Sequence, residues 1–289
     1  MVLLTKSKLA QKREKINADL FSAFPKENRL FEAISYAIMG SGKRVRPLIV
    51  LLIAEALGNK LDVSKAALAL EFFHTASLIA DDLPCMDNEE LRRDKPTLHK
   101  VYGESIALLS SYGLISEAFR KIHENGEEMK KAKEPFSSMA LEATSIALEC
   151  ASRCAGVQGA TLGQYLDLFP IKQEIESIEK VIALKTITLF EGSFVLGWVF
   201  GGGDFTQLER VKELAKHFGM AFQIRDDILD MEEDFKKKEH ANIALVIGKQ
   251  KAMNRFFQEL EKFKKLLKEL DVVSASFEEI CKKLTNNLK

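Results

Sequence analysis

Two groups of aspartates are the part of this sequence best suited to chemistry. Each group lies in a mostly apolar segment, where an unpaired carboxylate is unfavourable because it loses its water. Arginines stand beside both groups, at Arg92-Arg93 and at Arg225. Carboxylates concentrated in apolar surroundings indicate a bound cation. The groups consist of Asp81, Asp82 and Asp87, and of Asp226, Asp227 and Asp230.

The residue types select the cation and its partner. Magnesium prefers oxygen ligands, and the second group has no His or Cys beside it, whereas the first contains only Cys85. Magnesium commonly binds through one or two carboxylates together with phosphate oxygens. With arginines nearby, we expect several magnesium ions that are recruited together with a diphosphate.

Helix geometry tests this interpretation. Asp226 and Asp230 are four residues apart and therefore share a helix face. Asp81 and Asp87 are six residues apart and would not share a face of a regular helix. Pro84 lies between them, removes a backbone donor and disturbs the helix. We therefore expect a local bulge that brings Asp87 back beside Asp81.

Two alternatives compete with a metal site. A single aspartate group is often a solvated helix face or an N-terminal cap, but two groups with apolar neighbours favour metal binding. A calcium loop is disfavoured because neither group has alternating oxygen ligands, a central glycine and a distal glutamate.

The elements that must position these residues are expected to be helices. The chain has 289 residues, a hydrophobic fraction of 46% and 6 prolines, so it can bury a large core with few helix breakers. No repeat or linker divides it, and we expect one all-α domain over 1–289. Apolar residues recur at helical spacing in Val63, Ala67, Leu70 and Phe73, in Ile106, Leu109, Tyr112, Ile115 and Phe119, and in Phe256, Leu260, Phe263, Leu267 and Leu270.

Glycine, proline and charge interrupt this helical pattern at a few places. We expect loops at Gly58-Asn59, Glu124 to Lys133, Pro170 to Glu174 and Gly201 to Asp204.

Global charge and cysteine content exclude several classes of protein. Lys plus Arg equals Asp plus Glu at 42 each, so no overall field attracts nucleic acid. The apolar start is too short for a signal peptide or a membrane span, and the longer run from Pro47 to Ala54 is also far below spanning length, so we expect no membrane span. Four scattered cysteines indicate reduced thiols; Cys150 and Cys154 share a helix face, with buried packing favoured. We expect a soluble, cytoplasmic protein.

Taken together, these motifs identify a family: the chain resembles the trans-prenyl diphosphate synthases, which make farnesyl and geranylgeranyl diphosphates. The resemblance extends from about residue 15 to the end, and 81–104 is especially similar to the geranylgeranyl-forming branch. It implies the isoprenoid synthase fold, one all-α bundle of roughly ten or more helices around a central cleft. The matching motifs are Gly-Lys43-Arg-Val-Arg46-Pro47, 81–93, Gly163-Gln164-Tyr-Leu-Asp167, Lys185-Thr186 and Phe222-Gln223-Ile-Arg-Asp226-Asp227-Ile-Leu-Asp230.

The resemblance also implies roles for individual residues in a sequence of ionisation, condensation and proton elimination. Magnesium bound by both aspartate groups, with Arg92 nearby, would help an allylic diphosphate to leave. Isopentenyl diphosphate would bind Lys43, Arg46, His74 and Arg93. The developing cation would pass Lys185, Thr186 and Gln223. The expected metal ligands are Asp81, Asp82, Asp87, Asp226 and Asp230.

Product length and assembly are further expectations. Ala76 and Ser77 are small where farnesyl-forming relatives often carry an aromatic ring, so we expect a twenty-carbon product. Phe72 and Phe73 would then stop further growth of the chain, and farnesyl diphosphate is the alternative product.

Relatives are usually homodimers, and 194–203 or the helix from Ile106 could supply the contact between the two copies.

Departures from the family pattern leave two other functions open. Ala80 replaces a common histidine, Ser111-Tyr112 replaces Gly-Asp, and the segment after Asp230 lacks the usual Gly-Lys pattern, which Lys236, Lys237 and Lys238 could replace. A weakly active or regulatory subunit, or a terpene cyclase, is therefore an alternative. A regulatory subunit would be expected to lose one aspartate group, and a cyclase would not need Lys43, Arg46 and Arg93.

Overall fold

The chain folds almost entirely into α-helices, as expected. This computed structural model describes residues 7–25, 27–40, 42–170, 174–237, 242–286 and 288, with the side chains of 233 and 237 set aside. The helices of the first half are α1 (Lys8–Ser22), α2 (Arg29–Ile38), α3 (Val45–Leu57), α4 (Ser64–Asp81), α5 (Leu98–Tyr102), α6 (Glu104–Lys130) and α7 (Phe136–Ala155). The second half contains α8 (Ala160–Leu168), α9 (Ile175–Val181), η1 (Ile182–Ile187), α10 (Thr188–Phe200), η2 (Phe205–Gln207), α11 (Leu208–Lys237), α12 (Ile243–Ile247), α13 (Lys249–Glu269) and α14 (Ala275–Thr285).

The expected loops are only partly correct. Gly58 ends α3 with φ 77°, and 201–204 separates α10 from η2, as expected. The predicted loop from Glu124 to Lys133 is wrong over most of its length, because α6 continues to Lys130. Its charges form ion pairs along the helix, including Lys121 with Glu124 at 2.9 Å, instead of ending it. Of the predicted loop at 170–174, residues 171–173 lie outside the described residues.

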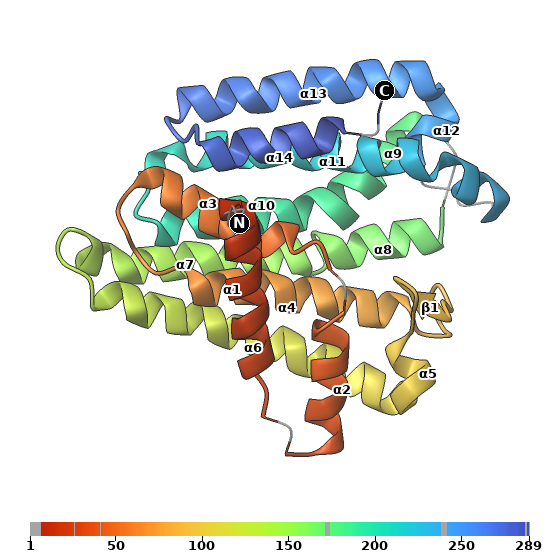
Figure 1. Cartoon of the computed structure of the whole chain (residues 1–289), viewed down its shortest axis with the longest axis horizontal. Helices are drawn as coiled ribbons and strands as arrows, with labels where there is room; N and C mark the ends of the chain where they lie inside the picture. The colour runs from red at the N-terminus through yellow and green to blue at the C-terminus, as the bar shows by residue number, and fades with distance from the viewer. Residues whose placement is uncertain are drawn as a thin grey trace, which may run out of the picture.

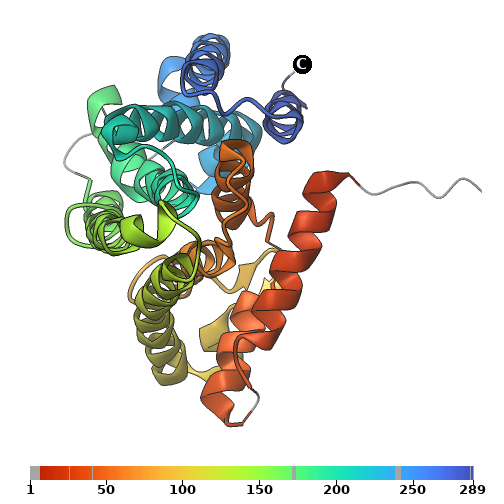
Figure 2. The same ribbon diagram turned by 90° about the vertical axis from the view of Figure 1, so that its left-hand side faces the viewer.

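Helix α10 forms the centre of the molecule. It packs against α3, α4, α7 and α11 (Figures 1 and 2), and every residue in it is buried except Glu191. Among the described residues, the continuous stretch Ile175–Phe200 is long and apolar enough to cross a membrane by length and composition. However, 72% of that window is buried inside the fold, which is typical of a core helix.

Phenylalanine rings join α10 to the C-terminal helices. Phe218 of α11 lies 5.1 Å from Phe190 and 5.2 Å from Phe263 of α13, measured between ring centroids. Phe194 stacks on Phe277 of α14 at 6.4 Å. Edge and tilted ring contacts of this kind stabilise a core beyond simple burial. They fix α11, which carries the second aspartate group, against α10.

A short hairpin follows the first aspartate group. Strands β1 (Leu91–Arg92) and β2 (Lys95–Pro96) pair antiparallel, and the turn between them holds Arg93 at φ 54° and Asp94 at φ 64°. The hydroxyl of Tyr36 in α2 donates to the carbonyl of Pro96 at 2.7 Å. The hairpin, which the sequence did not predict, therefore presents the arginine pair from a braced position.

The helix that contains Lys185 is locally unwound into a π-helix. Segment η1 separates α9 from α10, and single π-helical turns are frequent at functional sites. Gly163 of α8 packs against it so closely that a Cβ there would lie 2.3 Å from the backbone nitrogen of Lys185. Only glycine allows α8 and η1 to approach in this way.

Candidate active site

The first aspartate group is folded back on itself at the end of α4. The backbone N–H of Asp87 donates to the carbonyl of Asp81 at 2.9 Å, and the N–H of Asn88 donates to the carbonyl of Leu83 at 3.1 Å. Asn88 has φ 52°, in the left-handed region where asparagine is favoured. The expected bulge is therefore present, and Asp87 returns to Asp81.

Lys185 faces this group from η1. Burial raises the pKa of Asp81 to about 6, and the nearby ammonium of Lys185 opposes that rise. Burial by itself would lower the pKa of Lys185, but Asp167 and Asp81 raise it. Nζ of Lys185 lies 2.5 Å from Oδ2 of Asp167, and Nε2 of Gln164 lies 3.4 Å from Oδ1 of Asp87. Helix α8 and η1 thus complete one side of a cluster of carboxylates.

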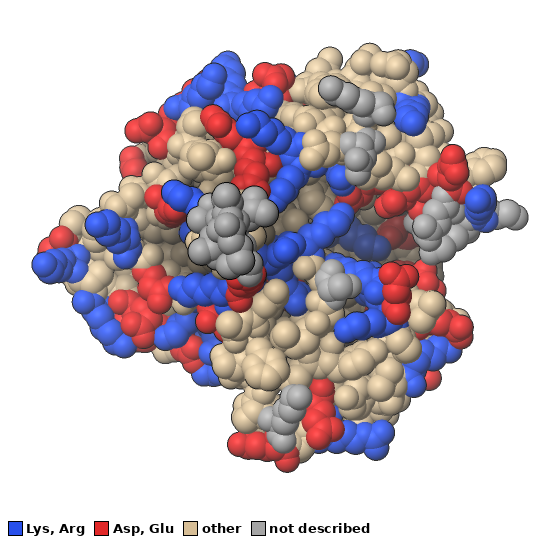
Figure 3. All heavy atoms as spheres, viewed as in Figure 1, with Lys and Arg blue, Asp and Glu red and all other residues tan. Residues whose placement is uncertain are grey.

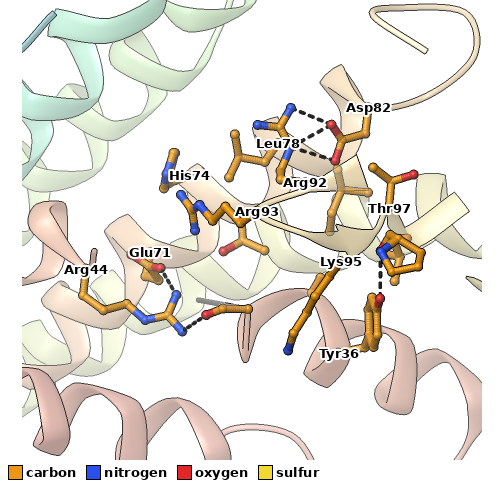
Figure 4. Close-up of a pocket in the computed structure, with 16 residues that line it drawn as sticks. Tyr36, Arg44, Glu71, His74, Leu78, Asp82, Arg92, Arg93, Lys95 and Thr97 are labelled. Atoms are coloured by element: carbon orange, nitrogen blue, oxygen red, sulfur yellow. Dashed lines mark hydrogen bonds and ion pairs between the residues drawn. The ribbon is translucent and has the colours of Figure 1, made fainter. Parts of the chain in front are cut away.

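Asp82 points to a different partner. It is buried, and both of its oxygens accept from Nε of Arg92, at 2.7 and 2.9 Å. Figure 4 shows this forked ion pair beside the pocket. Asp82 was expected among the metal ligands, but in the structure its carboxylate holds Arg92 in place.

The second group lies on α11. Oδ1 of Asp226 is 3.0 Å from Nη1 of Arg225 and 3.9 Å from Nζ of Lys43. Burial raises the pKa of Asp226, and those two cations oppose the rise. Asp230 follows one turn later and is exposed. Both carboxylates belong to the same face, as the spacing predicted.

Asp227 has a structural position. Its Oδ1 accepts from Gln223 and its Oδ2 accepts from the backbone N–H of Ile243, each at 2.8 Å, so it anchors the start of α12. Asn242 donates to the carbonyl of Asp227, also at 2.8 Å. Burial raises the pKa of Asp227 to about 7, although these hydrogen bonds oppose the rise.

Gln223 connects the second group to η1. The hydroxyl of Thr186 donates to Oε1 of Gln223 at 2.9 Å, while the amide nitrogen of Gln223 donates to Asp227. Lys185 faces the first group, and the next residue, Thr186, contacts Gln223, which in turn contacts Asp227 of the second group. Segment η1 therefore contacts the first group through Lys185 and, through Thr186 and Gln223, the helix that carries the second group.

A separate cationic pocket adjoins these carboxylates. Lys43 extends into solvent with 70% of its side chain exposed. The guanidinium of Arg46 lies 4.6 Å from the ring centroid of Phe190, and its Nη1 is 3.3 Å from Nε2 of His74. Burial of Arg46 lowers its pKa to about 10. Burial of His74, together with the nearby charge of Arg46, lowers the pKa of His74 well below its usual value. His74 is therefore neutral beside charged guanidinium groups.

Arg93 approaches Arg46 and His74 from the hairpin turn. His74, Arg92 and Arg93 line one pocket (Figure 4), and burial lowers the pKa of Arg93. Gly42 leaves room for this guanidinium, since a Cβ at Gly42 would lie 2.9 Å from Nη1 of Arg93. Figure 3 shows Lys and Arg side chains gathered around a hollow near the middle of that face. Of the residues expected to bind isopentenyl diphosphate, Arg46, His74 and Arg93 lie close together, whereas Lys43 is exposed and lines a neighbouring pocket with Phe222 and Arg225.

Arg44, between two of those residues, makes contacts within the protein that the sequence did not reveal. It begins α3 at φ 55°, is buried, and forms an ion pair with Glu71 at 2.5 Å. It also donates to the side chain of Asn17 and to the carbonyls of Ile38 and Gly40. Each of its three guanidinium nitrogens donates to a protein acceptor, whereas Nε of Arg46 is buried without a hydrogen-bond partner.

The residues of the site suit magnesium and diphosphate, because carboxylate oxygens can bind the metal and Arg46 can bind an anion. The clustered ligands are carboxylate oxygens, which suit magnesium. The buried Nε of Arg46 and Oε1 of Gln164 have no hydrogen-bond partner, and a buried polar atom of this kind requires an explanation. An anion on Arg46 would satisfy one of these atoms.

Two further site residues were present in the recognised motifs without an assigned role. Asp167 pairs with Lys185 and Gln164 contacts Asp87, which sequence spacing alone could not reveal because α8 and η1 are separate elements. Of the lysines expected to replace the usual pattern after Asp230, Lys238 and the side chain of Lys237 lie outside the described residues, and Lys236 is exposed.

Sequence comparison gives consistent relatives. A family profile described as Polyprenyl synthetase matches residues 27–244. Geranylgeranyl pyrophosphate synthase 4 of Arabidopsis thaliana is 39% identical over 230 residues, which cover 77% of this chain and 59% of that protein. Geranylgeranyl pyrophosphate synthase 3, chloroplastic, of the same plant is 38% identical over 231 residues, 77% of this chain and 62% of that protein. The chain thus spans about three fifths of the length of the curated relatives it matches.

Solved structures agree in fold. A geranyltranstransferase from Thermotoga maritima has a TM-score of 0.77 and 30% identity, covering 98% of this chain and 99% of that one. An FPP/GFPP synthase from Zymomonas mobilis has a TM-score of 0.80 and 30% identity, covering 96% and 99%. These matches extend the similarity over nearly the whole chain.

The comparisons also correct one expectation. Composition led us to expect a cytoplasmic protein, but several of the relatives are named as chloroplastic enzymes, including synthases 3 and 9 of Arabidopsis thaliana. Residue types and charge carry no direct record of compartment, which is why composition led to the wrong expectation.

Proposed function

Because this chain belongs to the polyprenyl synthetase family, we propose that it is a short-chain trans-prenyltransferase. It condenses isopentenyl diphosphate with an allylic diphosphate: dimethylallyl, geranyl or farnesyl diphosphate. The product is geranylgeranyl diphosphate. One observation carries this proposal: two sites for diphosphate lie next to each other and differ in kind. One is a carboxylate cluster, which would bind a diphosphate through magnesium, and the other is a pocket around the buried, unpartnered Nε of Arg46, which would bind a diphosphate directly.

The carboxylate cluster is the site for the allylic diphosphate. Asp81, Asp87, Asp226 and Asp230 are the residues that would hold magnesium, which when bound neutralises charge on the leaving diphosphate. Lys185 lies close enough to Asp81 and Asp87 to affect the pKa of both carboxyls. It therefore adds a fixed positive charge beside the leaving group.

The cationic pocket is the site for isopentenyl diphosphate. Lys43, Arg46 and Arg93 provide charge-assisted hydrogen bonds, which are the stronger kind. Neutral His74 can donate one hydrogen bond without adding further charge to a crowded set of guanidinium groups. Because Lys43 also lies 3.9 Å from Asp226, the two diphosphates bind side by side, which aligns the reacting carbons.

The segment between these sites faces the developing allylic cation. Thr186 and Gln223 present oxygen atoms joined by a hydrogen bond of 2.9 Å, and oxygen dipoles stabilise positive charge. Phe190 and Phe222 pack against each other at 5.0 Å next to Arg46 and Lys43, and their apolar surface excludes water. Exclusion of water protects the cation from hydrolysis.

Product length follows from the inner face of α4. Ala76 is buried one turn before Asp81, and its carbonyl accepts from the hydroxyl of Ser111 at 3.0 Å, so α6 lies close to it. Phe73, one turn deeper, contacts Phe119 of α6 edge to face at 5.1 Å. A small residue at 76 with an aromatic pair below it fits an elongated chain that stops at twenty carbons.

The dimer contact is assigned to α6. Of the two candidate segments, 194–203 is mostly buried in the core and cannot form a contact. Helix α6 exposes a stripe of apolar side chains at helical spacing, which is typical of an interface. This stripe consists of Leu108, Leu109, Tyr112 and Ile115. We assign a second copy of the chain to that face.

The function is tested by incubating the purified chain with isopentenyl and dimethylallyl diphosphates, with and without magnesium. The expected result is a linear twenty-carbon diphosphate that forms only with magnesium. Cyclic hydrocarbons would identify a terpene cyclase instead. No product from a folded chain, under conditions where a known synthase is active, would identify a regulatory subunit.

A further inference from the structure

A second cluster of metal-ligating side chains lies outside the proposed active site. Cys150 and Cys154 of α7 are both buried at 1% exposure, and Glu191 of α10 lies against them. One ligand atom from each of the three residues lies within 4.8 Å of the other two. We propose that Cys150, Cys154 and Glu191 bind one thiophilic divalent cation of the zinc type, which joins α7 to α10.

The sulfur geometry suits this metal. The two Sγ atoms are 3.8 Å apart. A tetrahedral zinc site with Zn–S bonds of ~2.3 Å separates two sulfurs by about 3.8 Å. The helix already holds the thiols at that separation, because residues four apart share a face. A disulfide would instead require the sulfurs to approach to about 2.05 Å.

Glu191 supplies the third candidate ligand, a carboxylate. It is the only residue of α10 that is not buried, in a helix that is otherwise a core element. Its Oε1 accepts from Nη2 of Arg153, which leaves the second carboxylate oxygen to face a metal. Metal-bound carboxylates are commonly fixed by such a hydrogen bond from an outer residue.

The charges are balanced for a divalent ion. Arg153 already offsets the charge of Glu191, so two thiolates would add two negative charges that zinc neutralises. Glu191, with 15% of its side chain exposed, gives the ion a route from solvent.

The position gives the metal a consequence for the fold. Helix α7 leads into α8, which carries Gln164 and Asp167, while α10 follows η1, which carries Lys185. A metal between α7 and α10 would therefore fasten the two elements that meet at Gly163. The expected effect is a higher unfolding temperature when zinc is bound.

Cobalt spectroscopy tests the site. Co2+ added to the full, reduced chain is expected to produce a thiolate-to-metal charge-transfer band that saturates at one equivalent and is displaced by Zn2+. The aspartate carboxylates offer oxygen ligands and produce no such band. Cys85 is the one thiol within the first aspartate group, and Cys85→Ser is expected to retain the band, so the result does not depend on the proposed enzymatic function. A spectrum without this band would overturn the proposal.

Variants localise the signal. Cys150→Ser and Cys154→Ser are expected to abolish the band, whereas Cys281→Ser, at a buried thiol elsewhere, retains it. Glu191→Gln is expected to weaken zinc binding at least about tenfold. A band that survives either serine change, or is lost with Cys281→Ser, contradicts the assignment.

A measurement on the wild-type chain covers the case in which a variant does not fold. Zinc is expected to slow the reaction of two of the four thiols with a thiol reagent. Equal reaction rates with and without zinc would contradict the site.

Discussion

Nζ of Lys185 lies 2.5 Å from Oδ2 of Asp167, and this ion pair joins η1 to α8 beside the first aspartate group. The pair keeps the ammonium next to Asp81, whose pKa it lowers against the effect of burial. Because Gly163 lets the two backbones touch, the position of Lys185 depends on α8 as well as on its own helix. The cation at the centre of the site is thus fixed by tertiary packing.

Removal of either main carboxylate is expected to abolish most turnover. Asp81→Ala and Asp226→Ala each remove oxygen ligands that stabilise the leaving diphosphate, so we expect kcat to fall at least about a hundredfold. Steady-state kinetics measures the loss, and circular dichroism checks the fold. Glu142→Ala, an exposed carboxylate on α7, serves as the control. Near-normal turnover in both aspartate variants would refute the assignment of these ligands.

Arg46 and Arg44 form a matched pair of variants with different expected effects. Arg46→Gln is expected to raise KM for isopentenyl diphosphate roughly tenfold to a hundredfold, because a charged hydrogen bond to the substrate is lost. The KM of the allylic substrate should change little. Initial-rate kinetics with each substrate varied separately measures the difference. An equal rise in both KM values would speak against a separate isopentenyl site.

Arg44→Gln is expected to destabilise the fold instead. It breaks a buried ion pair in which both side chains are 4% exposed, so we expect a loss of about 3–5 kcal/mol in the free energy of unfolding. Urea unfolding followed by circular dichroism measures it. A wild-type midpoint for Arg44→Gln would show that the contacts to Glu71 contribute nothing.

Stability is expected to fall with rising pH through Asp227. Burial raises the pKa of this carboxyl to about 7 in the folded chain, against about 3.9 when unfolded. Between those values the folded chain holds a proton that the unfolded chain has released, so the free energy of unfolding falls by up to about 1.4 kcal/mol per pH unit. Urea unfolding at pH 5, 6, 7 and 8 measures the slope.

The matched variant for this pH dependence is Asp227→Asn, which cannot titrate. Its slope should be shallower than that of the wild type, and the difference should end above about pH 7. Other buried carboxyls such as Asp81 remain in both chains and cancel in the comparison. Parallel slopes for the two chains would show that Asp227 stays ionised when buried.

Product length is expected to depend on residue 76. Ala76→Tyr places a ring into the space between α4 and α6, so products should shorten from twenty to fifteen carbons or fewer. Chromatography of dephosphorylated products measures their length. If the wild-type chain already stops at fifteen carbons, the explanation based on Ala76 and Phe73 is wrong.

The sequence predicted those parts of the molecule that local pattern determines. Apolar spacing located α4, α6 and α13, and Pro84 indicated the bulge at Asp87. The two-residue strands β1 and β2 are too short for any alternation to appear, and α6 continued through Lys130 because its charges pair along the helix. Arg44 and Arg46 are identical residue types two positions apart. Only their tertiary partners distinguish the structural arginine from the proposed ligand.

The exposed stripe of α6 provides the last prediction. Tyr112, with 58% exposure, lies near the middle of this stripe, so Tyr112→Glu places a charge where a second copy would pack. A charge buried without a partner at an interface is unfavourable, and we expect a dimer of wild-type chains to become a monomer. Light scattering coupled to size-exclusion chromatography measures the mass. Val273→Glu changes an equally apolar, 50% exposed residue between α13 and α14, and should leave the dimer intact. A monomeric wild type, or a dimer that survives Tyr112→Glu, would exclude α6 as the interface.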